Sequence, residues 1–490
     1  MEKEKIKSTG LLQELNGVPE NIRHIHLMGI CGTGMSSLAG ILREKGFSVT
    51  GSDGNIYPPV STLLESLCIP LFEGYDPAHL YPNPDLVIVG NVITTDNPQA
   101  VELSNLKIPY LSFPQAIRHF AIKDKYPVVI TGTHGKTTTS SLAAWILEKA
   151  GRYPGFMIGG IPLNFNVNFK IGKGPFFIIE GDEYDTAFFD KGPKFLHYNP
   201  KIAVLTSIEF DHADIYRDLD HVTQSFRRLV DLMSDKELLI ANGDSMLVKK
   251  EVERAGCPVA LYGFSENLPW RADDIRINKG LTRLTIKKEG RKYVELSTQL
   301  YGRHNISNIL SAVVLSDFLE IPGEVLKEAL MEFKGVKRRQ EIVGEKYGIL
   351  VLDDFAHHPT AVRETVTAVR ERYEDRRLVA IFEPRSNSSR RRVFQKQYAL
   401  SFDGADLVMI PEPPLMDKIP ENERFSSKCL VEDLVKRGIR ALYFSGTDQM
   451  IEEMTRESMK GDVFLFMSNG GFDNVPRRFL DRLEISGNDL

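Results

Sequence analysis

The stretch Pro127-Val-Val-Ile-Thr-Gly-Thr-His-Gly-Lys136-Thr-Thr-Thr139 decides the fold, because it reads as a buried strand, a glycine turn and the start of a helix. The backbone N–H groups of such a turn and the N-terminus of the helix present positive partial charge to phosphate oxygens. Lys136 adds a full charge, and the Thr137 hydroxyl is a ligand that Mg²⁺ accepts. The stretch therefore predicts a phosphate-binding loop, with ATP as its nucleotide and Mg²⁺ as its metal.

The loop departs from the usual spacing of such motifs. The position where the usual pattern has its first glycine is Ile130 here. The shorter run Gly132, Thr133, His134, Gly135, Lys136, Thr137 and Thr138 therefore predicts a variant loop at the ATP phosphates. We expect an amphipathic helix over residues 138–149, with Gly151 just beyond its end. An ordinary helix start with a surface lysine is the alternative interpretation of Gly-Lys-Thr alone.

Length and charge place the chain among large globular proteins. With 490 residues it is too long for one hydrophobic core, and about three domains are expected. The formal net charge of -5 argues against a dedicated nucleic-acid binder. The four cysteines are far apart and lack metal-binding spacing, which is typical of reduced thiols. No apolar run approaches the ~20 residues that span a bilayer, so we expect a cytoplasmic protein with no membrane partner. We also expect a monomer with no nucleic-acid partner.

Strand, glycine turn and helix recur at three widely separated places, which predicts an α/β fold built from three units. The units are expected over residues 1–124, 125–334 and 335–490. A β-rich stretch over residues 275–296 interrupts the alternation in the central unit. We expect strands at 24–28, 47–50, 176–179, 202–206, 349–352, 378–382, 407–410, 441–444 and 463–467, and a helix over 359–372.

A second glycine turn follows the first expected strand. It contains Gly29, Gly32, Thr33, Gly34, Met35 and Ser36. The nicotinamide-dinucleotide pattern would need glycine at Cys31, so a nicotinamide enzyme is disfavoured. The turn still suits a diphosphate at a helix N-terminus, and Asp53, after the next strand, is placed to meet a sugar hydroxyl. We expect a nucleotide-linked substrate here; a turn needed only for tight packing is the alternative.

Two acidic stretches follow expected strands of the central unit. The first contains Glu180, Asp182 and Glu183, and the second contains Asp211 and His212. Because the carboxyl ends of parallel strands meet at one edge of a sheet, these groups are expected near the phosphates. Carboxylates are the ligands that Mg²⁺ takes beside phosphate oxygens. A solvated acidic loop is the alternative.

Polar groups also open the last part of the chain. Asn305 and Asn308 lie three residues apart at an expected helix start, and so share one face. Arg339 and Asp354 follow near the start of the third unit. The arginine is expected to reach ATP phosphates across a domain cleft, although a solvated basic linker would have the same composition.

In this order, the motifs resemble those of the Mur ligases, the ATP-dependent amide-forming enzymes of peptidoglycan synthesis. The most specific stretches are 131–138, 209–212, 302–308 and 353–359, and the likeness covers nearly the whole chain from about Asn21. The resemblance implies a Rossmann-like N-terminal domain, a central phosphate-loop ATPase-like domain and a Rossmann-like C-terminal domain.

The resemblance also implies residue roles. Lys136, Glu180 and His212 would be catalytic, with Thr137, Glu180 and His212 as Mg²⁺ ligands. Asn305 and Asn308 would face ATP, Arg339 its phosphates and Asp354 its ribose. Some family members use a carbamoylated lysine after the Asp-His motif; residues 225–228 read Ser-Phe-Arg-Arg here, so no carbamate is predicted.

Within the family, the first glycine turn is similar to the branch that uses UDP-N-acetylmuramate. Stretches at 90–93, 154–160, 182–191, 382–387 and 467–472 look like the branch that attaches L-Ala-γ-D-Glu-meso-diaminopimelate in cell-wall recycling. The resemblance implies that reaction, through an acyl phosphate, with Arg385, Ser386 and Asn387 receiving the peptide. The alternatives are L-alanine as the acceptor in de novo synthesis and, from another class, a nucleotide-binding regulator. His357, His358 and Asp354 all remain candidates to deprotonate the amine.

Overall fold

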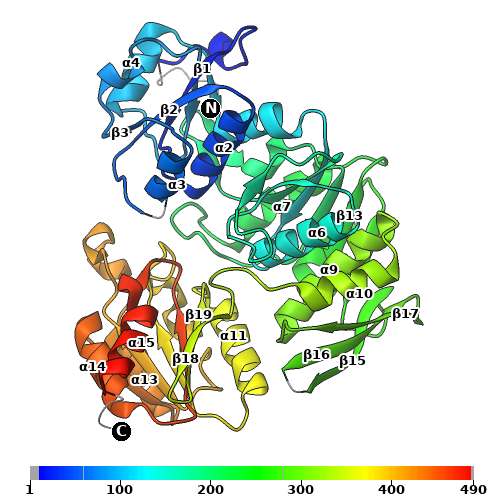
Figure 1. The fold of residues 1–490 in the computed structure, drawn as a ribbon, viewed down its shortest axis with the longest axis vertical. Helices are drawn as coiled ribbons and strands as arrows, with labels where there is room; N and C mark the ends of the chain where they lie inside the picture. The colour runs from blue at the N-terminus through cyan, green and yellow to red at the C-terminus, as the bar shows by residue number, and fades with distance from the viewer. Residues whose placement is uncertain (1–9, 59, 279, 487–490) are drawn as a thin grey trace.

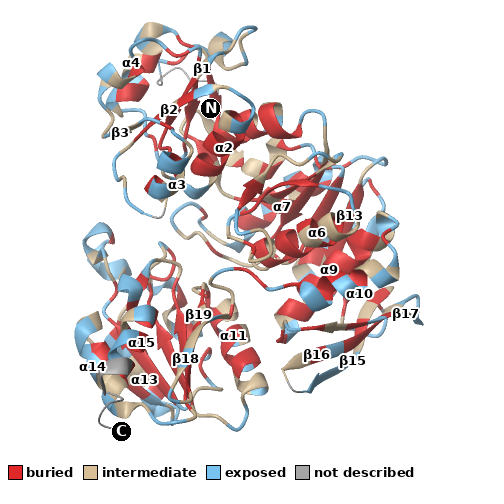
Figure 2. Cartoon of the chain, in the orientation of Figure 1, coloured by how far each residue is buried: buried red, intermediate tan, exposed pale blue. Residues whose placement is uncertain are grey.

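The computed structural model describes residues 10–486 except residues 59 and 279. Three sheets, each packed against helices, follow one another along the chain (Figure 1). The N-terminal domain is blue, the central domain runs from cyan to green, and the C-terminal domain runs from yellow to red. Buried residues concentrate in the strands and in the helix faces turned toward them (Figure 2). The predicted α/β fold class is confirmed.

The N-terminal domain contains a parallel five-stranded sheet in the order β3-β2-β1-β4-β5. β1 and β4 lie in its middle; β4 is wholly apolar and buried, because both faces of a parallel sheet are covered, while β1 also carries His24 and His26. β2 ends at Asp53, where Ser52 pairs with Met28, so this carboxylate lies beside the turn after β1. The elements are β1 His24–Met28, α2 Thr33–Glu44, β2 Ser48–Asp53, α3 Val60–Ser66, β3 Leu71–Glu73, β4 Leu86–Val89, α4 Pro98–Leu106, β5 Tyr110–Ser112 and α5 Phe113–Ile117.

The central domain contains a ten-stranded sheet in the order β17-β16-β15-β14-β13-β12-β6-β9-β7-β8. Its strands from β7 to β15 are parallel, while β16, β17 and β8 run antiparallel to their neighbours. The strands are β6 Tyr126–Thr131, β7 Gly155–Met157, β8 Phe169–Lys170, β9 Phe176–Gly181, β12 Ile202–Leu205, β13 Leu238–Asn242, β14 Val259–Gly263, β15 Trp270–Asn278, β16 Leu281–Lys288 and β17 Arg291–Thr298. The helices are α6 Lys136–Lys149, α7 Leu219–Leu232, α8 Met246–Val252, α9 Arg303–Phe318 and α10 Gly323–Glu332, and a hairpin joins β10 Asp185–Ala187 to β11 Asp190–Pro193.

The C-terminal domain contains a six-stranded sheet in the order β18-β19-β23-β20-β21-β22, in which only β18 is antiparallel among the described strands. The strands are β18 Glu341–Lys346, β19 Ile349–Asp354, β20 Leu378–Phe382, β21 Leu407–Pro411, β22 Arg440–Phe444 and β23 Val463–Met467. The helices are α11 Pro359–Arg372, α12 Gln395–Tyr398, α13 Ser427–Lys436, α14 Thr447–Glu457 and α15 Val475–Ser486.

One expectation about the central domain needs correction. The helix after the phosphate loop is not amphipathic: α6 is buried from Thr137 to Leu147 except at Trp145, because α9 and α10 pack over it. The β-rich stretch interrupts the alternation of strands and helices as expected, because no helix among the described residues separates β14, β15, β16 and β17. It extends the same sheet: β15 pairs with β14 in parallel, and β16 and β17 follow in antiparallel fashion.

The N-terminal and central domains share one continuous hydrophobic core. Buried residues of α2 belong to the same cluster as Phe169 of β8 and Phe226 of α7. Gly40, in the middle of α2, lets the ring of Phe169 approach the helix: a Cβ there would lie 2.1 Å from Phe169 Cζ. Beside this contact, Asn168 Nδ2 donates a hydrogen bond of 2.8 Å to Ser37 Oγ.

We therefore expect Gly40→Val to destabilise this interface by about 1–3 kcal/mol, the typical cost of overpacking a filled core. Thermal unfolding followed by calorimetry should show a lower midpoint. Gly17→Ala is the matched control, because nothing lies within 4 Å of its Cβ position. Equal midpoints for Gly40→Val and the control would contradict the close contact with Phe169.

Candidate functional site

The turn between β6 and α6 is held against the end of β12. Thr133 N donates to Ser207 O over 3.1 Å, and His134 N donates to Ser207 Oγ over 3.0 Å. Gly132 and Gly135 have φ angles of 125° and 83°, which favour glycine. A Cβ on Gly132 would also lie 2.2 Å from Thr206 Oγ1. The first turn of α6 has no side-chain cap, so its N–H groups suit phosphate oxygens.

Lys136, the first residue of α6, contacts a carboxylate that sequence reasoning did not assign. Its Nζ donates to Glu183 Oε2 over 2.8 Å and to Gly132 O over 2.7 Å. Glu183 is buried, and its other oxygen, Oε1, lies 3.5 Å from His212 Nε2. Lys136, Glu183 and His212 therefore form a connected cluster at the ends of β6, β9 and β12.

The cluster is charged. Burial lowers the pKa of Lys136, but the carboxylates of Glu183 and Asp182 outweigh it, and the pKa is raised. Burial disfavours the carboxylate form of Glu183, but Lys136 and His212 lower its pKa. Burial also lowers the pKa of His212, and the hydrogen bond to Glu183 reverses this effect, so that its pKa is raised. The site therefore holds a buried cation and a buried anion side by side.

A second group lies beside this cluster at the same edge of the sheet. Thr137 Oγ1 donates to Glu180 Oε2 over 3.2 Å, and Gly159 N donates to Glu180 Oε1 over 2.6 Å. Arg339 Nη2 reaches Thr137 Oγ1 over 3.4 Å from the C-terminal part of the chain. Burial and the neighbouring Asp182 raise the pKa of Glu180. A nearby cation would stabilise its carboxylate form.

These donors suit Mg²⁺, which prefers oxygen ligands and phosphate oxygens. Thr137, Glu180 and Glu183 offer hydroxyl and carboxylate oxygens, and His212 offers an imidazole beside Glu183. Thr137, Glu180 and His212 are the predicted metal ligands, and the structure brings them to one edge of the sheet, where Glu183 joins them.

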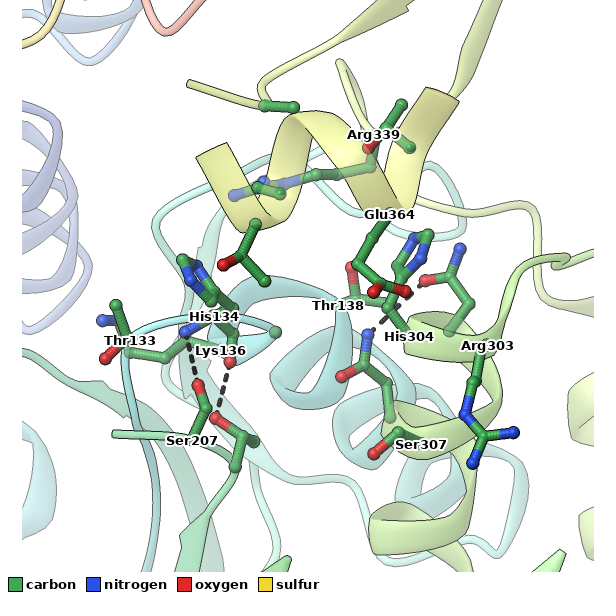
Figure 3. A pocket seen from close by; sticks show the side chains of 18 of the residues that line it. Thr133, His134, Lys136, Thr138, Ser207, Arg303, His304, Ser307, Arg339 and Glu364 are labelled. Atoms are coloured by element: carbon green, nitrogen blue, oxygen red, sulfur yellow. Dashed lines mark hydrogen bonds between the residues drawn. The ribbon is translucent and has the colours of Figure 1, made fainter. Parts of the chain in front are cut away.

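A cavity of about 360 Å³ lies between this loop, α9 and the start of the C-terminal domain. Figure 3 shows Lys136 and His134 of the loop, Arg303 and Ser307 of α9, and Arg339 of the C-terminal domain around it. The volume falls within the usual range of small-molecule sites. The predicted ATP residues that line it are Thr133, His134, Gly135, Lys136, Thr137, Thr138, Asn305, Asn308, Arg339 and Asp354, and Gly132 lies in the same loop.

Hydrogen bonds fix the two asparagines and Asp354 at the wall of the cavity. Asn305 Nδ2 donates to Gln340 Oε1 over 3.1 Å, and Asn308 Oδ1 accepts from Thr139 Oγ1 over 3.3 Å. Asp354 Oδ2 accepts from Gln340 N over 2.8 Å. Gln340 therefore connects α9 to the C-terminal domain.

The glycine turn of the N-terminal domain is held by Asp53. Its Oδ2 accepts from Cys31 N over 2.9 Å, in the turn that contains Gly29, Gly32, Thr33, Gly34, Met35 and Ser36. α2 begins at Thr33, directly after the turn. Its N-cap residue, Gly32, has no side chain to accept the first backbone N–H groups of the helix, so these groups suit a diphosphate. Gly34 lies against the ring of Phe113, where a Cβ would approach to 3.0 Å.

Lys194 connects this turn to the central site. Its Nζ lies 5.5 Å from the ring centroid of Phe113 and 4.3 Å from that of Tyr184. It also forms an ion pair of 3.0 Å with Asp182. Tyr184 in turn packs against His212, with 4.9 Å between ring centroids. The two binding loops are therefore linked by packed side chains.

The loop that contains Arg385, Ser386 and Asn387 lies against the loop that follows His212. Asn387 Nδ2 donates to Asp214 Oδ2 over 2.8 Å, and Ala213 N donates to Ser388 Oγ over 3.1 Å. Arg385 Nη1 lies 3.3 Å from Glu383 Oε1 and its side chain is 36% exposed. Ser386 Oγ donates to Ser389 Oγ over 2.9 Å.

Sequence reasoning missed several residues of the site. Glu183 stood in the acidic stretch, but nothing in its spacing separated it from Glu180. Lys194 carried no signal, because its importance comes from the partners that surround it. The remaining cavity residues that were missed come mainly from strand ends and α9: Thr206, Ser207, Asn242, Asp244, Phe264, Arg303, His304, Ser307 and Gln340. For Thr206, Ser207, Asn242 and Phe264, the position at or after the end of a parallel strand was the usable signal.

Three family models match consecutive parts of the chain. "Mur ligase family, catalytic domain" covers residues 24–125, "Mur ligase middle domain" covers 130–316, and "Mur ligase, glutamate ligase domain" covers 338–470. Among the described residues, no helix is long and apolar enough to cross a bilayer.

Individual relatives match over almost the full chain. The UDP-N-acetylmuramate–L-alanyl-γ-D-glutamyl-meso-2,6-diaminoheptandioate ligase of Escherichia coli K12 is 38% identical over 461 residues, which are 94% of this chain and 98% of the relative. A UDP-N-acetylmuramate–L-alanine ligase of Caldanaerobacter subterraneus subsp. tengcongensis is 32% identical, with 94% and 98% covered. The crystal structure of a murein peptide ligase from Psychrobacter arcticus is 34% identical, with a TM-score of 0.71 and with 94% and 98% covered. Because its three domains match in order and these likenesses span 94% of its length, the chain belongs to the Mur ligase family.

Proposed function

We propose that this chain is an ATP-dependent ligase that joins L-Ala-γ-D-Glu-meso-diaminopimelate to UDP-N-acetylmuramate in the cytoplasmic recycling of cell-wall peptides. The observation that carries this proposal is the comparison of relatives at equal coverage. The peptide-adding relative is 38% identical, whereas the L-alanine-adding relative is 32% identical. L-Alanine as the acceptor is therefore the second candidate.

The proposed reaction first activates a carboxylate, which is anionic and lacks a good leaving group. A lactyl oxygen of UDP-N-acetylmuramate attacks the γ-phosphorus of ATP, ADP leaves, and an acyl phosphate forms. Lys136 lies at the phosphate loop, so its ammonium group stabilises the charge on the transferred phosphoryl oxygens. Mg²⁺ held by Thr137, Glu180, Glu183 and His212 would supply further positive charge at the phosphates.

The peptide amine then attacks the acyl carbon, and phosphate leaves. The amine must be neutral, and a free α-amino group has a pKa of about 7.7–8.0, so little assistance is needed. Among the three candidates, the contacts disfavour Asp354, because both of its oxygens accept backbone N–H groups, from Gln340 and Ala356. Burial lowers the pKa of His357 and of His358 and so favours, in both, the neutral imidazole that can accept a proton.

The positions of the three loops support this order of events. The UDP-sugar is proposed to bind at the turn of Gly32, the nucleotide at the loop of Lys136, and the peptide at Arg385. The hydrogen bond between Ala213 and Ser388 keeps the Arg385 loop next to His212. Joining three substrates depends mainly on how they are positioned, and three domains around one edge of the central sheet can hold them next to one another.

The domain boundaries after residues 124 and 334 are part of the proposal. β5 ends at Ser112 and β6 begins at Tyr126, while α10 ends at Glu332 and β18 begins at Glu341. Each boundary therefore falls between sheets. A monomer is proposed because one chain supplies all three binding loops.

We expect Lys136→Ala, Glu180→Ala and His212→Ala to fold and to lose ligation by on the order of 10²-fold or more, because each removes charge or a metal ligand at the phosphoryl group. Phosphate release measures ligation, and circular dichroism measures folding. Lys201→Ala is the control, since this lysine also pairs with a glutamate of the same domain, Glu237. Near-normal turnover of Lys136→Ala would remove the ATP-site assignment.

Glu183→Gln should also reduce ligation strongly while preserving shape, because an amide cannot balance the charges of Lys136 and His212. The loss should be seen in kcat for the fully saturated enzyme. Glu237→Gln serves as the matched control, because it changes the ion pair with Lys201, whose side chain is 45% exposed. If Glu183→Gln kept the kcat of the unmodified enzyme, Glu183 would have no part in the phosphoryl site.

The acceptor is tested by offering tripeptide and L-alanine together. We expect tripeptide to be consumed far more efficiently, because its several carboxylates suit the guanidinium of Arg385. Arg385→Ala should raise the KM for tripeptide. Equal or better use of L-alanine would identify the second candidate, and no substrate-dependent phosphate release with either acceptor would favour a nucleotide-binding regulator.

A further inference from the structure

We propose that His134, Glu209 and His358 form a binding site for a transition-metal ion such as Zn²⁺, which bridges the central and C-terminal domains. His134 belongs to the phosphate loop and Glu209 follows β12, both in the central domain. His358 precedes α11 in the C-terminal domain, as its N-cap. The proposal does not depend on the ligase reaction, and it concerns a site apart from the proposed magnesium ligands.

The ligand atoms are already close to the spacing that a metal requires. Glu209 Oε2 lies 3.5 Å from His134 Nε2 and 3.7 Å from His358 Nδ1. One ligand atom from each of the three residues lies within 4.8 Å of the others. Tetrahedral ligands at the usual zinc distances of about 2.0–2.1 Å are about 3.3–3.4 Å apart, so small rotations of the side chains would complete the site.

The chemistry of the donors favours a borderline-soft ion. Two imidazoles and one carboxylate are typical of Zn²⁺ sites that keep a further position for water. Mg²⁺ prefers an all-oxygen set.

Hydrogen bonds fix the orientation of the three residues. His358 Nε2 lies 3.0 Å from the backbone carbonyl of Phe210, which selects the tautomer whose Nδ1 carries a lone pair. That lone pair accepts a long hydrogen bond of 3.3 Å from Thr360 N, which a bound metal ion would replace. Thr360 Oγ1 donates to Glu209 Oε2 over 2.6 Å, as an outer partner of a ligating carboxylate does. His134 is anchored through its backbone to Ser207.

His134 provides an independent sign that a partner is missing. Its Nε2 is buried and makes no hydrogen bond within the described part of the chain, although Glu209 lies 3.5 Å away. Buried polar side-chain atoms normally have a partner, so this nitrogen calls for an explanation. A metal ion between His134, Glu209 and His358 supplies one.

A metal bound here would join the phosphate loop to the first turn of α11. The other contacts between these domains combine polar groups, as with Asn387 and Asp214, with packing of Phe210 and Tyr301 against the C-terminal core. Occupancy should therefore hold the two domains together and slow any opening that the nucleotide cavity requires.

The direct test is a titration of the metal-free, full-length protein with Co²⁺ in excess Mg²⁺, which occupies the oxygen-rich site. We expect one Co²⁺ per chain with visible ligand-field bands of a low-coordinate site, displaced by Zn²⁺. Glu209→Gln and His358→Gln should each weaken binding at least tenfold, since disturbing even outer partners of a metal costs that much. His357→Gln, the adjacent histidine outside the cluster, should leave binding unchanged. Unchanged binding in both ligand variants, or an equal loss in His357→Gln, would overturn the proposal.

A second measurement needs no variant and so does not depend on how the variants fold. Cu²⁺ bound to the unmodified protein should give an electron paramagnetic resonance spectrum with hyperfine coupling from two imidazole nitrogens. Coupling from one nitrogen or none would rule out this ligand set.

Hydrogen exchange tests the bridge. Zn²⁺ should slow amide exchange at both the phosphate loop and the start of α11, and slowing at only one of them would exclude a bridging ion.

Discussion

The buried ion pair between Lys136 and Glu183 is the constraint on which the site depends. Their side chains are only 13% and 2% exposed, and an unpaired charge at such depth costs several kcal/mol. The pair forms only if the loops after β6 and β9 meet. Glu183 then brings in His212 from the loop after β12. Because β6 lies between β12 and β9 in the sheet, one electrostatic requirement aligns three strand ends into a phosphoryl-transfer site.

The two domain interfaces differ in character. A continuous apolar core joins the N-terminal and central domains, with Phe169 packed on Gly40, so these two should behave as one body. The C-terminal domain meets the central domain through polar groups, including Arg339 to Thr137 and Asn387 to Asp214, and through Tyr301 and Phe210, which pack against the C-terminal core. The nucleotide cavity and the proposed metal site both lie at this mixed interface. Substrates and ions that bind there can therefore influence the relative orientation of the central and C-terminal domains.

Much of the fold could be predicted from the sequence, because strands and helices of a parallel α/β protein have strong local signals. β20, β23 and α11 have the predicted bounds, whereas β2 runs from Ser48 to Asp53 and so extends beyond the predicted end at residue 50. The prediction for α6 was wrong. Its threonines and serines suggested a polar face, but they are buried under α9 and α10. The buried Ser141 hydroxyl has its hydrogen-bond partner within the helix, because it donates to Thr137 O over 2.7 Å. Local periodicity does not reveal such burial when small hydroxyl side chains can bond to their own helix.

The sequence by itself determined the class of chemistry: a glycine turn, lysine and threonine between a strand and a helix, followed by acidic and histidine-bearing strand ends, indicate phosphate and metal. It also placed these groups at one edge of a sheet. Only the tertiary structure decided that Lys136 pairs with Glu183 while Glu180 faces Thr137, and that His358 approaches His134 from another domain. The reason is physical. Chain spacing fixes which strand end carries a side chain, whereas the order of strands and the packing of whole domains fix which side chains meet.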